Sequence, residues 1–147
     1  MGSTFYSLHY HIVFSTKERR PFIRLVWRSR LHEYLGGTVR GLGGVAESIG
    51  GVEDHVHALV SLKTTDAPAA VVRELKKASS VLAAETHEPL FAWQEGYSIF
   101  STSWTHVPIL RRYITGQETH HKKTTFVDEL KRLLEKNGVQ YDPKYLS

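Results

Sequence analysis

The stretch VEDHVHALVSL, residues 52–62, places two histidines one residue apart inside a run of apolar side chains. Residues i and i+2 of a β-strand point to the same face, with Cα atoms about 6.6–6.8 Å apart. His55 and His57 would therefore share one face of a strand, while Val56, Ala58 and Val60 would enter a hydrophobic core from the other. The stretch predicts a strand that belongs to a core on one side and presents paired imidazoles on the other.

The segments around this strand predict an alternation of strands and helices, based on apolar periods of two and of about 3.6. Four strands are expected, at residues 6–15, 45–49, 52–62 and 97–103. Four helices are expected, at residues 22–40, 66–86, 108–123 and 125–137. The order β-α-β-β-α-β-α-α is that of a ferredoxin-like split β-α-β fold. We therefore predict one α+β domain over residues 1–147: an antiparallel sheet with helices on one face, plus a tyrosine-bearing helix and a final helix.

Local signals mark several of these boundaries. For the helix at 66–86, Asp66 can serve as the N-cap, and Pro68 suits a position in the first turn. Before the final helix, Thr125-x-x-Asp128 resembles a capping box. The glycine-rich run at residues 36–51 contains no G-x-G-x-x-G that follows a strand and opens a helix. We interpret that run as a helix stop with turns around a short strand, rather than as a phosphate-binding loop.

Composition narrows the class of protein only slightly. The 147 residues include no cysteine, which excludes disulfides and thiolate metal sites and fits a reducing cytoplasm. The N-terminus lacks a basic region followed by a long apolar one, and no apolar run is long enough for a bilayer, so we expect neither a signal peptide nor a membrane span. A formal charge of +4 permits a polyanionic partner without requiring one.

The histidine pair alone does not establish a metal site. Two imidazoles on one strand face can converge on a cation, but a second H-x-H motif, His9-Tyr10-His11, occurs in the same chain, and both pairs could be ordinary half-buried histidines. A third ligand could come from the predicted helix after Pro108, where Tyr113 and Gln117 are four residues apart and share one face. Each of these two residues also has an ordinary interpretation, the tyrosine as a packing residue and the glutamine as a solvated one.

Two histidines and two tryptophans that could bind metal or DNA are assigned more ordinary roles. His120 and His121 are adjacent, and adjacent helical residues point about 100° apart, so we interpret them as surface histidines near phosphate rather than as further metal ligands. Trp93 and Trp104 are interpreted as core or interface aromatics rather than as platforms for stacked bases.

Three separated motifs together resemble a known family. DHVHALVSL at 54–62, KKASS at 76–80 and RRYITGQETHH at 111–121 resemble the single-tyrosine HUH transposases, which include small bacterial insertion-sequence transposases and their REP-associated relatives. The opening YHIVFSTKERRPF at 10–22 resembles the first strand and turn of that family, and the tail from Phe126 resembles one of its branches. The resemblance covers nearly the whole chain in the family's order.

The resemblance implies a metal-dependent reaction on single-stranded DNA. By motif match, Tyr113 would be the nucleophile, and His55, His57 and Gln117 would hold Mg²⁺ or Mn²⁺. Imidazole and amide oxygen suit such a cation, which polarises the scissile phosphate. The product would be a 5′-phosphotyrosine link and a free 3′-hydroxyl. Because the covalent link conserves the phosphodiester energy, rejoining would need no nucleotide cofactor.

The resemblance also implies recognition of DNA hairpins near the ends of an element, by a protein of the bacterial cytoplasm. Basic residues that could hold the strand follow the first strand or lie on two predicted helices. The DNA-binding candidates are Lys17, Arg19, Arg20, Arg73, Lys76, Lys77, Arg111 and Arg112. We expect a homodimer, although relatives include monomers, and whether Tyr113 would act in its own subunit or in a partner stays open.

Two departures from the family pattern and three other functions were considered. Gly116 stands where relatives often carry Asn, and could loosen the helix so that Tyr113 moves; Glu53 replaces a frequent proline. A domesticated hairpin-binding protein with little or no cleavage activity is the main alternative. A histidine-triad hydrolase would need a third histidine at position 59, which is Leu59. An RNA-binding ferredoxin-like domain would need exposed aromatic residues on its central strands, whereas residues 55–62 carry histidines.

Overall fold

The computed structural model describes residues 2–146 and contains four strands and five α-helices within them. The strands are β1 (His9–Ser15), β2 (Val45–Gly51), β3 (His55–Ser61) and β4 (Ser98–Thr102). The α-helices are α1 (Leu25–Gly41), α2 (Pro68–Thr86), α3 (Val107–Thr115), α4 (Gln117–His120) and α5 (Phe126–Lys136). Three short 3₁₀ helices complete the chain: η1 (Lys17–Arg19), η2 (Trp104–His106) and η3 (Pro143–Tyr145).

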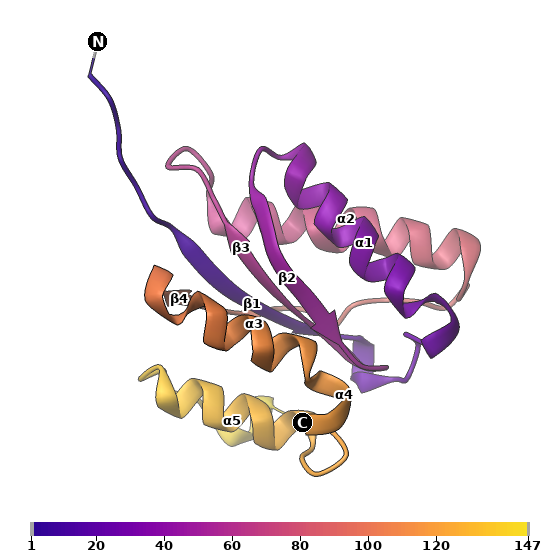
Figure 1. Ribbon diagram of the computed structural model, residues 1–147. Helices are drawn as coiled ribbons and strands as arrows, with labels where there is room; N and C mark the ends of the chain where they lie inside the picture. The colour runs from indigo at the N-terminus through magenta and orange to yellow at the C-terminus, as the bar shows by residue number, and fades with distance from the viewer. Residues whose placement is uncertain (1, 147) are drawn as a thin grey trace.

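The four strands form one antiparallel sheet in the order β2-β3-β1-β4 (Figure 1). The two crossovers, through α1 and through α2, place β3 next to β1 and leave β2 and β4 at the edges. This is the order of a ferredoxin-like split β-α-β fold. The predicted α+β class with an antiparallel sheet is therefore confirmed. In the central pair, Val13 lies opposite His57 and Ser15 lies opposite His55.

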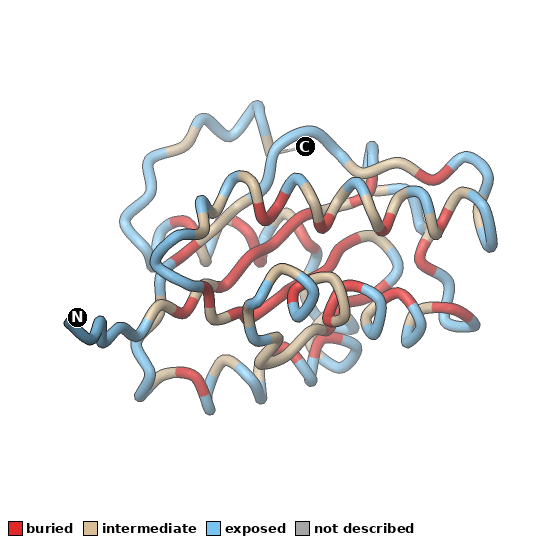
Figure 2. The backbone as a smooth tube through the Cα atoms, turned by 90° about the horizontal axis from the view of Figure 1, so that it is seen from above, coloured by how far each residue is buried: buried red, intermediate tan, exposed pale blue. Residues whose placement is uncertain are grey.

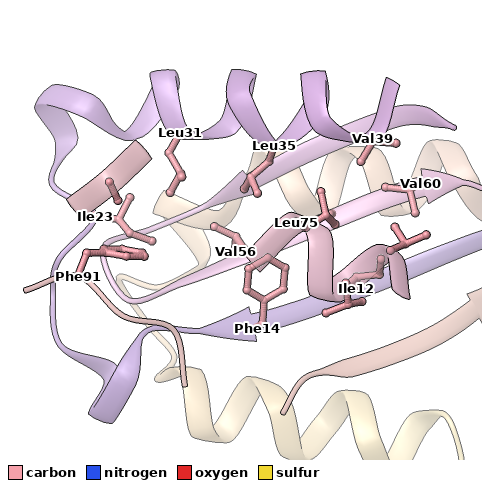
Figure 3. Packing of buried hydrophobic residues seen from close by; sticks show 14 of the residues in the cluster. Ile12, Phe14, Ile23, Leu31, Leu35, Val39, Val56, Val60, Leu75 and Phe91 are labelled. Carbon is pink, nitrogen blue, oxygen red and sulfur yellow. The ribbon is translucent and has the colours of Figure 1, made fainter. Parts of the chain in front are cut away.

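One face of the sheet packs on α1 and α2. Even-numbered residues of the two central strands, such as Ile12 and Val56, meet Leu31, Leu35 and Leu75 from these helices (Figure 3). Strand alternation predicts this side of the core, because residues i, i+2 and i+4 line one face. Val56, Ala58 and Val60 are all buried there, as predicted.

The opposite face of the sheet packs on the C-terminal helices. Figure 1 shows α3 and α5, in orange and yellow, on the side of the sheet away from α1 and α2. Val13 and Phe100 contact Leu130 and its neighbours on α5, while Leu59 contacts Ile114 on α3. Helices therefore cover both faces. His55, His57 and Leu59, which alternate along β3 on this face, are buried, and Figure 2 shows the buried residues in red along the middle of the molecule.

Gly50 allows α3 to lie close to the sheet. A Cβ at this position would be 2.4 Å from the carbonyl oxygen of Ile114, so a side chain there would push α3 away from β2. Because glycine has no Cβ, the backbone of α3 can approach the edge strand closely. The glycine-rich run is thus no phosphate-binding loop: it contains the end of α1, a turn at Gly43 with φ +86°, and β2.

Two local predictions were wrong and one is confirmed. The helix expected over 108–123 is interrupted at Gly116, so that α3 ends at Thr115 and α4 begins at Gln117. Asp66 does not cap α2: the N-cap is Ala67, and the Asp66 carboxylate accepts a hydrogen bond from the Lys63 backbone N–H (3.0 Å). Thr125 does cap α5, since its hydroxyl accepts the Asp128 N–H (3.2 Å). Within residues 2–146, no helix combines the length and the apolar character needed to cross a membrane.

Candidate active site

His55 and His57 lie side by side on β3, and neither ring has any solvent exposure. Each ring uses Nδ1 to reach a group outside the pair. His55 donates from Nδ1 to the Asp54 carboxylate (2.7 Å), and His57 Nδ1 lies 2.8 Å from His11 Nε2. The second H-x-H motif thus contributes one residue, His11, which supports the first pair from the neighbouring strand. The two Nε2 atoms are left to face the C-terminal helices.

Glu129 on α5 receives these two nitrogens. Its Oε1 lies 3.1 Å from His57 Nε2 and 3.3 Å from His55 Nε2, and the residue is only 2 % exposed. A buried carboxylate is costly unless charged or hydrogen-bonding partners surround it, and Glu129 has them on every side. The glutamate therefore connects α5 directly to the face of β3 that carries the histidines.

Tyr113 and Gln117 reach the same glutamate from α3 and α4. The Tyr113 hydroxyl donates a hydrogen bond to Glu129 Oε2. Gln117 donates from Nε2 to Glu129 Oε2 (2.9 Å), and its Oε1 lies 3.0 Å from His55 Nε2. The two side chains still share one face across the break at Gly116. All four predicted catalytic and metal-site residues, namely Tyr113, His55, His57 and Gln117, are thus brought together within one chain.

His121 also belongs to this cluster, so its interpretation as a surface histidine was wrong. Its Nε2 lies 3.0 Å from Glu129 Oε1, and its Nδ1 donates to the Thr124 carbonyl (2.7 Å). Its ring lies 4.5 Å from the His55 ring, centroid to centroid. His120, the adjacent residue, lies against the Tyr113 ring, and its Nε2 lies 3.4 Å from the other oxygen of Glu129, Oε2. Adjacent helical residues point about 100° apart, which separates the two rings. That angle did not justify placing His121 outside the site.

The charges in the cluster are strongly coupled. Burial raises the pKa of the Glu129 carboxyl, but hydrogen bonds from His121, His55 and His57 outweigh it and hold that pKa well below its usual range. Burial lowers the pKa of His55, yet its hydrogen bonds with Asp54 and Glu129 raise it to about 9. Burial also lowers the pKa of His57, and it lowers that of His11, next to His57, to about 3. The cluster thus holds an ionised carboxylate beside a protonated His55.

The Tyr113 phenol is held in its neutral form. Burial raises its pKa above the usual value of about 10, and the hydrogen bond to the Glu129 carboxylate raises it further. A neutral phenol is a poor nucleophile. A reaction at Tyr113 would therefore need a group that takes its proton, and the Glu129 carboxylate is in contact with that proton.

The cluster has the composition of a divalent metal site. The ligand atoms of His55, His57, His121 and Glu129 all lie within 4.8 Å of one another. Imidazole nitrogens and a carboxylate oxygen are ligands that divalent cations accept. A buried His/Glu group able to bind a divalent ion is therefore present beside the Tyr113 hydroxyl.

Surface hollows reach this buried cluster from two sides. One lies between α3 and α5, and it is lined by Leu110, Tyr113, Glu129, Arg132 and Leu133 among others. Another lies beside His121, and it is lined by three basic residues, Arg19, Lys122 and Lys123, and by three acidic ones, Glu18, Glu53 and Asp54. Both Tyr113 and the histidine cluster are thus within reach of a molecule that binds at the surface.

The predicted DNA-binding residues do not form a single surface. Arg73, Lys76 and Lys77 lie on α2, on the far side of the sheet from the histidines, and Lys76 donates to the carbonyls of Gln94 (2.6 Å) and Gly96 (2.8 Å). Arg111 pairs with Glu47 on β2 (3.2 Å). Arg19 alone of the eight lines the hollow beside His121. The remaining three, Lys17, Arg20 and Arg112, are exposed.

A comparison with protein-family models decides the family. Residues 4–117 match the model described as "Transposase IS200 like". The chain belongs to the IS200-like transposase family. The match covers the histidine strand and extends to Gln117, and the resemblance to insertion-sequence and REP-associated transposases is confirmed. Members of the IS200-like family are transposases, enzymes that cut DNA.

Two solved transposase structures share the fold. A candidate transposase from Deinococcus radiodurans R1 aligns with a TM-score of 0.66 and 21 % identity, over 78 % of this chain and 93 % of that one. A REP-associated tyrosine transposase bound to a REP hairpin aligns with a TM-score of 0.57 and 14 % identity, over 78 % of this chain and 70 % of that one. A search of curated proteins finds no match.

Two residues of the cluster, Glu129 and His121, were not predicted as site residues, although the sequence carries a signal for each. Glu129 occupies an apolar stripe, between Phe126 and Leu130 on the buried face of α5. A charged residue on such a stripe needs a buried partner. His121 follows Gln117 by four residues, which repeats the spacing from Tyr113 to Gln117.

Proposed function

We propose that the protein cleaves and rejoins single-stranded DNA at hairpin-bearing ends, with Tyr113 as the nucleophile and a divalent ion held by His55, His57 and Gln117. The proposal builds on membership of the IS200-like transposase family. One observation carries it: the Tyr113 hydroxyl and the paired imidazoles contact the same carboxylate, that of Glu129, in a single chain.

The proposed reaction is an in-line displacement at phosphorus. The Tyr113 oxygen forms a bond to the scissile phosphorus, and the bond from phosphorus to the 3′ oxygen breaks. The phenol proton passes along its hydrogen bond to Glu129 Oε2 and on to water, and the departing 3′ oxygen takes up a proton from water to give a 3′-hydroxyl. A 3′-hydroxyl attacks the phosphotyrosine in the reverse direction, releases Tyr113 and restores the phosphodiester.

The bound ion would polarise the scissile phosphate and neutralise its developing charge. The residues around it keep the ligands oriented, because Asp54 fixes the ring of His55 and His11 fixes the ring of His57. Gln117 is held by its hydrogen bond to Glu129, and its Oε1 faces His55. These contacts favour a site that is organised before DNA arrives.

The proposed DNA path is the hollow beside His121. Arg19, Lys122 and Lys123 line that hollow next to the cluster, and these cationic side chains would hold phosphates of a single strand. The structure of a REP-associated relative bound to a REP hairpin supports a hairpin as the ligand class. The α2 residues Arg73, Lys76 and Lys77 are proposed to contact more distant parts of the DNA.

The direct test is capture of the covalent intermediate. The protein is incubated with Mg²⁺ or Mn²⁺ and a 3′-labelled single strand that contains a hairpin, and the adduct is digested and mapped by mass spectrometry. We expect the DNA 5′-phosphate on Tyr113 and an adduct that disappears in excess EDTA. An adduct on Tyr97 or Tyr141 would contradict the assignment, and the absence of any adduct across a panel of hairpin strands would contradict the proposed reaction.

We propose that Tyr113 acts in its own subunit, even if the protein is a homodimer. The contact of Tyr113 with Glu129 and the histidine cluster within one chain supports this arrangement. A mixture of Tyr113→Phe and His55→Ala/His57→Ala proteins should therefore form no adduct above either variant alone. Recovery toward a quarter or more of wild-type activity would instead indicate a tyrosine supplied by the partner. Sedimentation of the mixture establishes that subunits associate and exchange.

Gly116 is proposed to let Tyr113 move between its contact with Glu129 and the DNA. The helix is interrupted there, and a Cβ would lie 3.2 Å from the Arg112 carbonyl oxygen, so alanine can be accommodated with a small shift. Because alanine favours a continuous helix by about 1 kcal/mol, Gly116→Ala should slow cleavage by up to about fivefold. Single-turnover cleavage rates measure this, and a variant with unchanged cleavage and rejoining would contradict the role.

A second candidate function is hairpin binding with little or no cleavage. One observation favours it, namely that burial and Glu129 raise the pKa of the Tyr113 phenol, which opposes its ionisation. Such a protein would bind hairpin strands equally well with Tyr113 or Phe at this position and would form no adduct with either metal.

A further inference from the structure

Three imidazoles, not two, turn their Nε2 atoms toward one carboxylate oxygen. Glu129 Oε1 lies 3.0 Å from His121 Nε2, 3.1 Å from His57 Nε2 and 3.3 Å from His55 Nε2. His55 comes from β3, His121 from the end of α4 and Glu129 from α5. Three separate elements thus bring four donor atoms to a single point.

The outer nitrogen of each ring is already engaged. Nδ1 of His55 donates to the Asp54 carboxylate, and Nδ1 of His121 donates to the Thr124 carbonyl. Nδ1 of His57 contacts His11 Nε2. Histidines that bind metals in proteins almost always pair their second nitrogen with a carboxylate, carbonyl or similar group, because this fixes the ring and its tautomer. The Nδ1 atom of His121 has such a partner, as that of His55 does.

The spacing of the donor atoms also fits a coordination shell. Bonds of about 2.0–2.1 Å from a metal to nitrogen or oxygen give edges of about 3.3 Å in a tetrahedral site. The distances from Glu129 Oε1 to the three nitrogens, 3.0–3.3 Å, are close to such edges. The second oxygen of Glu129 faces Tyr113 and Gln117 instead.

We propose that His121 and Glu129 are metal ligands together with His55 and His57, and that this three-imidazole, one-carboxylate set selects Zn²⁺, Co²⁺ or Mn²⁺ over Mg²⁺. The inference deepens the proposed function and rests on the cation that it places at the histidine pair. It adds two ligands from beyond the segment that matches the family model, residues 4–117. Glu129 would then coordinate the metal through Oε1 and accept the hydrogen bond of the Tyr113 hydroxyl through Oε2.

The donor set gives the physical reason for this selection. Imidazole suits borderline transition ions, whereas Mg²⁺ prefers oxygen ligands and gives up its water reluctantly. A site with three imidazole rings, buried under α5, offers Mg²⁺ only two protein oxygens, Glu129 Oε1 and the Gln117 amide oxygen. For transition ions affinity should rise from Mn²⁺ to Co²⁺, with Zn²⁺ also bound tightly.

The test measures binding of the metal alone, without DNA. Full-length protein is freed of metal with EDTA, exchanged into buffer, and titrated with Co²⁺, Zn²⁺, Mn²⁺ and Mg²⁺ by calorimetry, with the visible absorption of Co²⁺ as a second readout. We expect one equivalent of Co²⁺, bound at least about 100-fold more tightly than Mg²⁺. His121→Ala and Glu129→Gln should each weaken Co²⁺ binding by about tenfold or more.

The matched control is His9→Ala, which removes another buried histidine of the sheet that has no contact with Glu129 and should leave Co²⁺ affinity unchanged. His121→Gln repeats the test with a larger polar side chain, and circular dichroism in EDTA checks that each variant is folded. Equal affinity for Mg²⁺ and Co²⁺, unchanged binding in both His121→Ala and Glu129→Gln, or an equal loss in His9→Ala would each overturn the inference. Formation of the covalent DNA adduct with Mg²⁺ is measured separately on the same preparations. That measurement tests the proposed function, and its result does not depend on the outcome of the metal titration.

Discussion

Tyr113→Phe is expected to abolish the covalent DNA adduct and to lower strand cleavage by at least about 10³-fold, because it removes the only oxygen that the proposal allows to attack phosphorus. The substitution is conservative for the fold. The ring packs against His57 and His120, and phenylalanine keeps those contacts while losing the hydrogen bond to Glu129. Denaturing gels with a 3′-labelled hairpin strand measure both adduct and cleavage.

Tyr97→Phe is the matched control for this experiment. Tyr97 is partly exposed and lines a hollow with Arg19 and Gln94 rather than the histidine cluster, so its loss should leave the adduct at the wild-type level. Hairpin affinity of Tyr113→Phe, measured by fluorescence anisotropy, should also match that of the wild type. Persistent cleavage in Tyr113→Phe would refute the proposed nucleophile, and equal binding with no adduct in either protein would favour the hairpin-binding function.

His57→Ala is expected to have the next largest effect, a loss of about 10²-fold or more in cleavage. The ring is fully buried and faces Glu129 through Nε2, so alanine removes one of the proposed ligands of the ion. A metal ion contributes several kcal/mol to stabilising charge in the transition state, and each 1.4 kcal/mol is about a factor of ten in rate. The loss should be smaller at higher concentrations of Mn²⁺, if weakened metal binding is its cause. Single-turnover rates across a metal titration measure this.

His9→Ala provides the comparison, because His9 belongs to the other H-x-H motif and is also buried. It contacts Ser7 and lies near Glu47 and Trp104, with no contact to Glu129. Cleavage by His9→Ala should remain near the wild-type rate at every metal concentration. A similar loss in both variants would mean that removing any buried histidine disturbs the fold, and the metal role of His57 would lose its support.

The sheet and the pair of buried faces could be predicted because they depend on local periodicity. Alternation along 52–62 is enough to put Val56 and His55 on opposite faces, whatever covers them. The same holds for Tyr113 and Gln117, whose spacing by four residues survives the break at Gly116. Short-range spacing therefore predicted that each pair shares one face. The family resemblance, not the spacing, assigned these four residues to a site, and neither could establish that the two pairs would meet.

Glu129 escaped prediction because its role depends on a contact across 72 residues of sequence. Nothing within α5 says which sheet face the helix covers, and a glutamate in a charged amphipathic helix is usually solvated. His121 was missed for a different reason. The prediction considered only the angle between His121 and the adjacent His120. The informative spacing was the one to Gln117, four residues earlier, which places both side chains on one face of a helix. The break at Gly116 agrees with the low helix propensity of glycine, and Asp66 does not cap α2 because its carboxylate accepts the Lys63 backbone N–H instead.

The position of α5 also bears on how relatives can diverge. The family match ends at Gln117, yet the helix that follows inserts Glu129 against the strand histidines. Two proteins could thus inherit the same strands and the same tyrosine helix while differing in the terminal segment that closes over them. Exchange of that segment between relatives would alter the ion that each prefers and the ease with which its phenol loses a proton, and the inherited core would remain untouched.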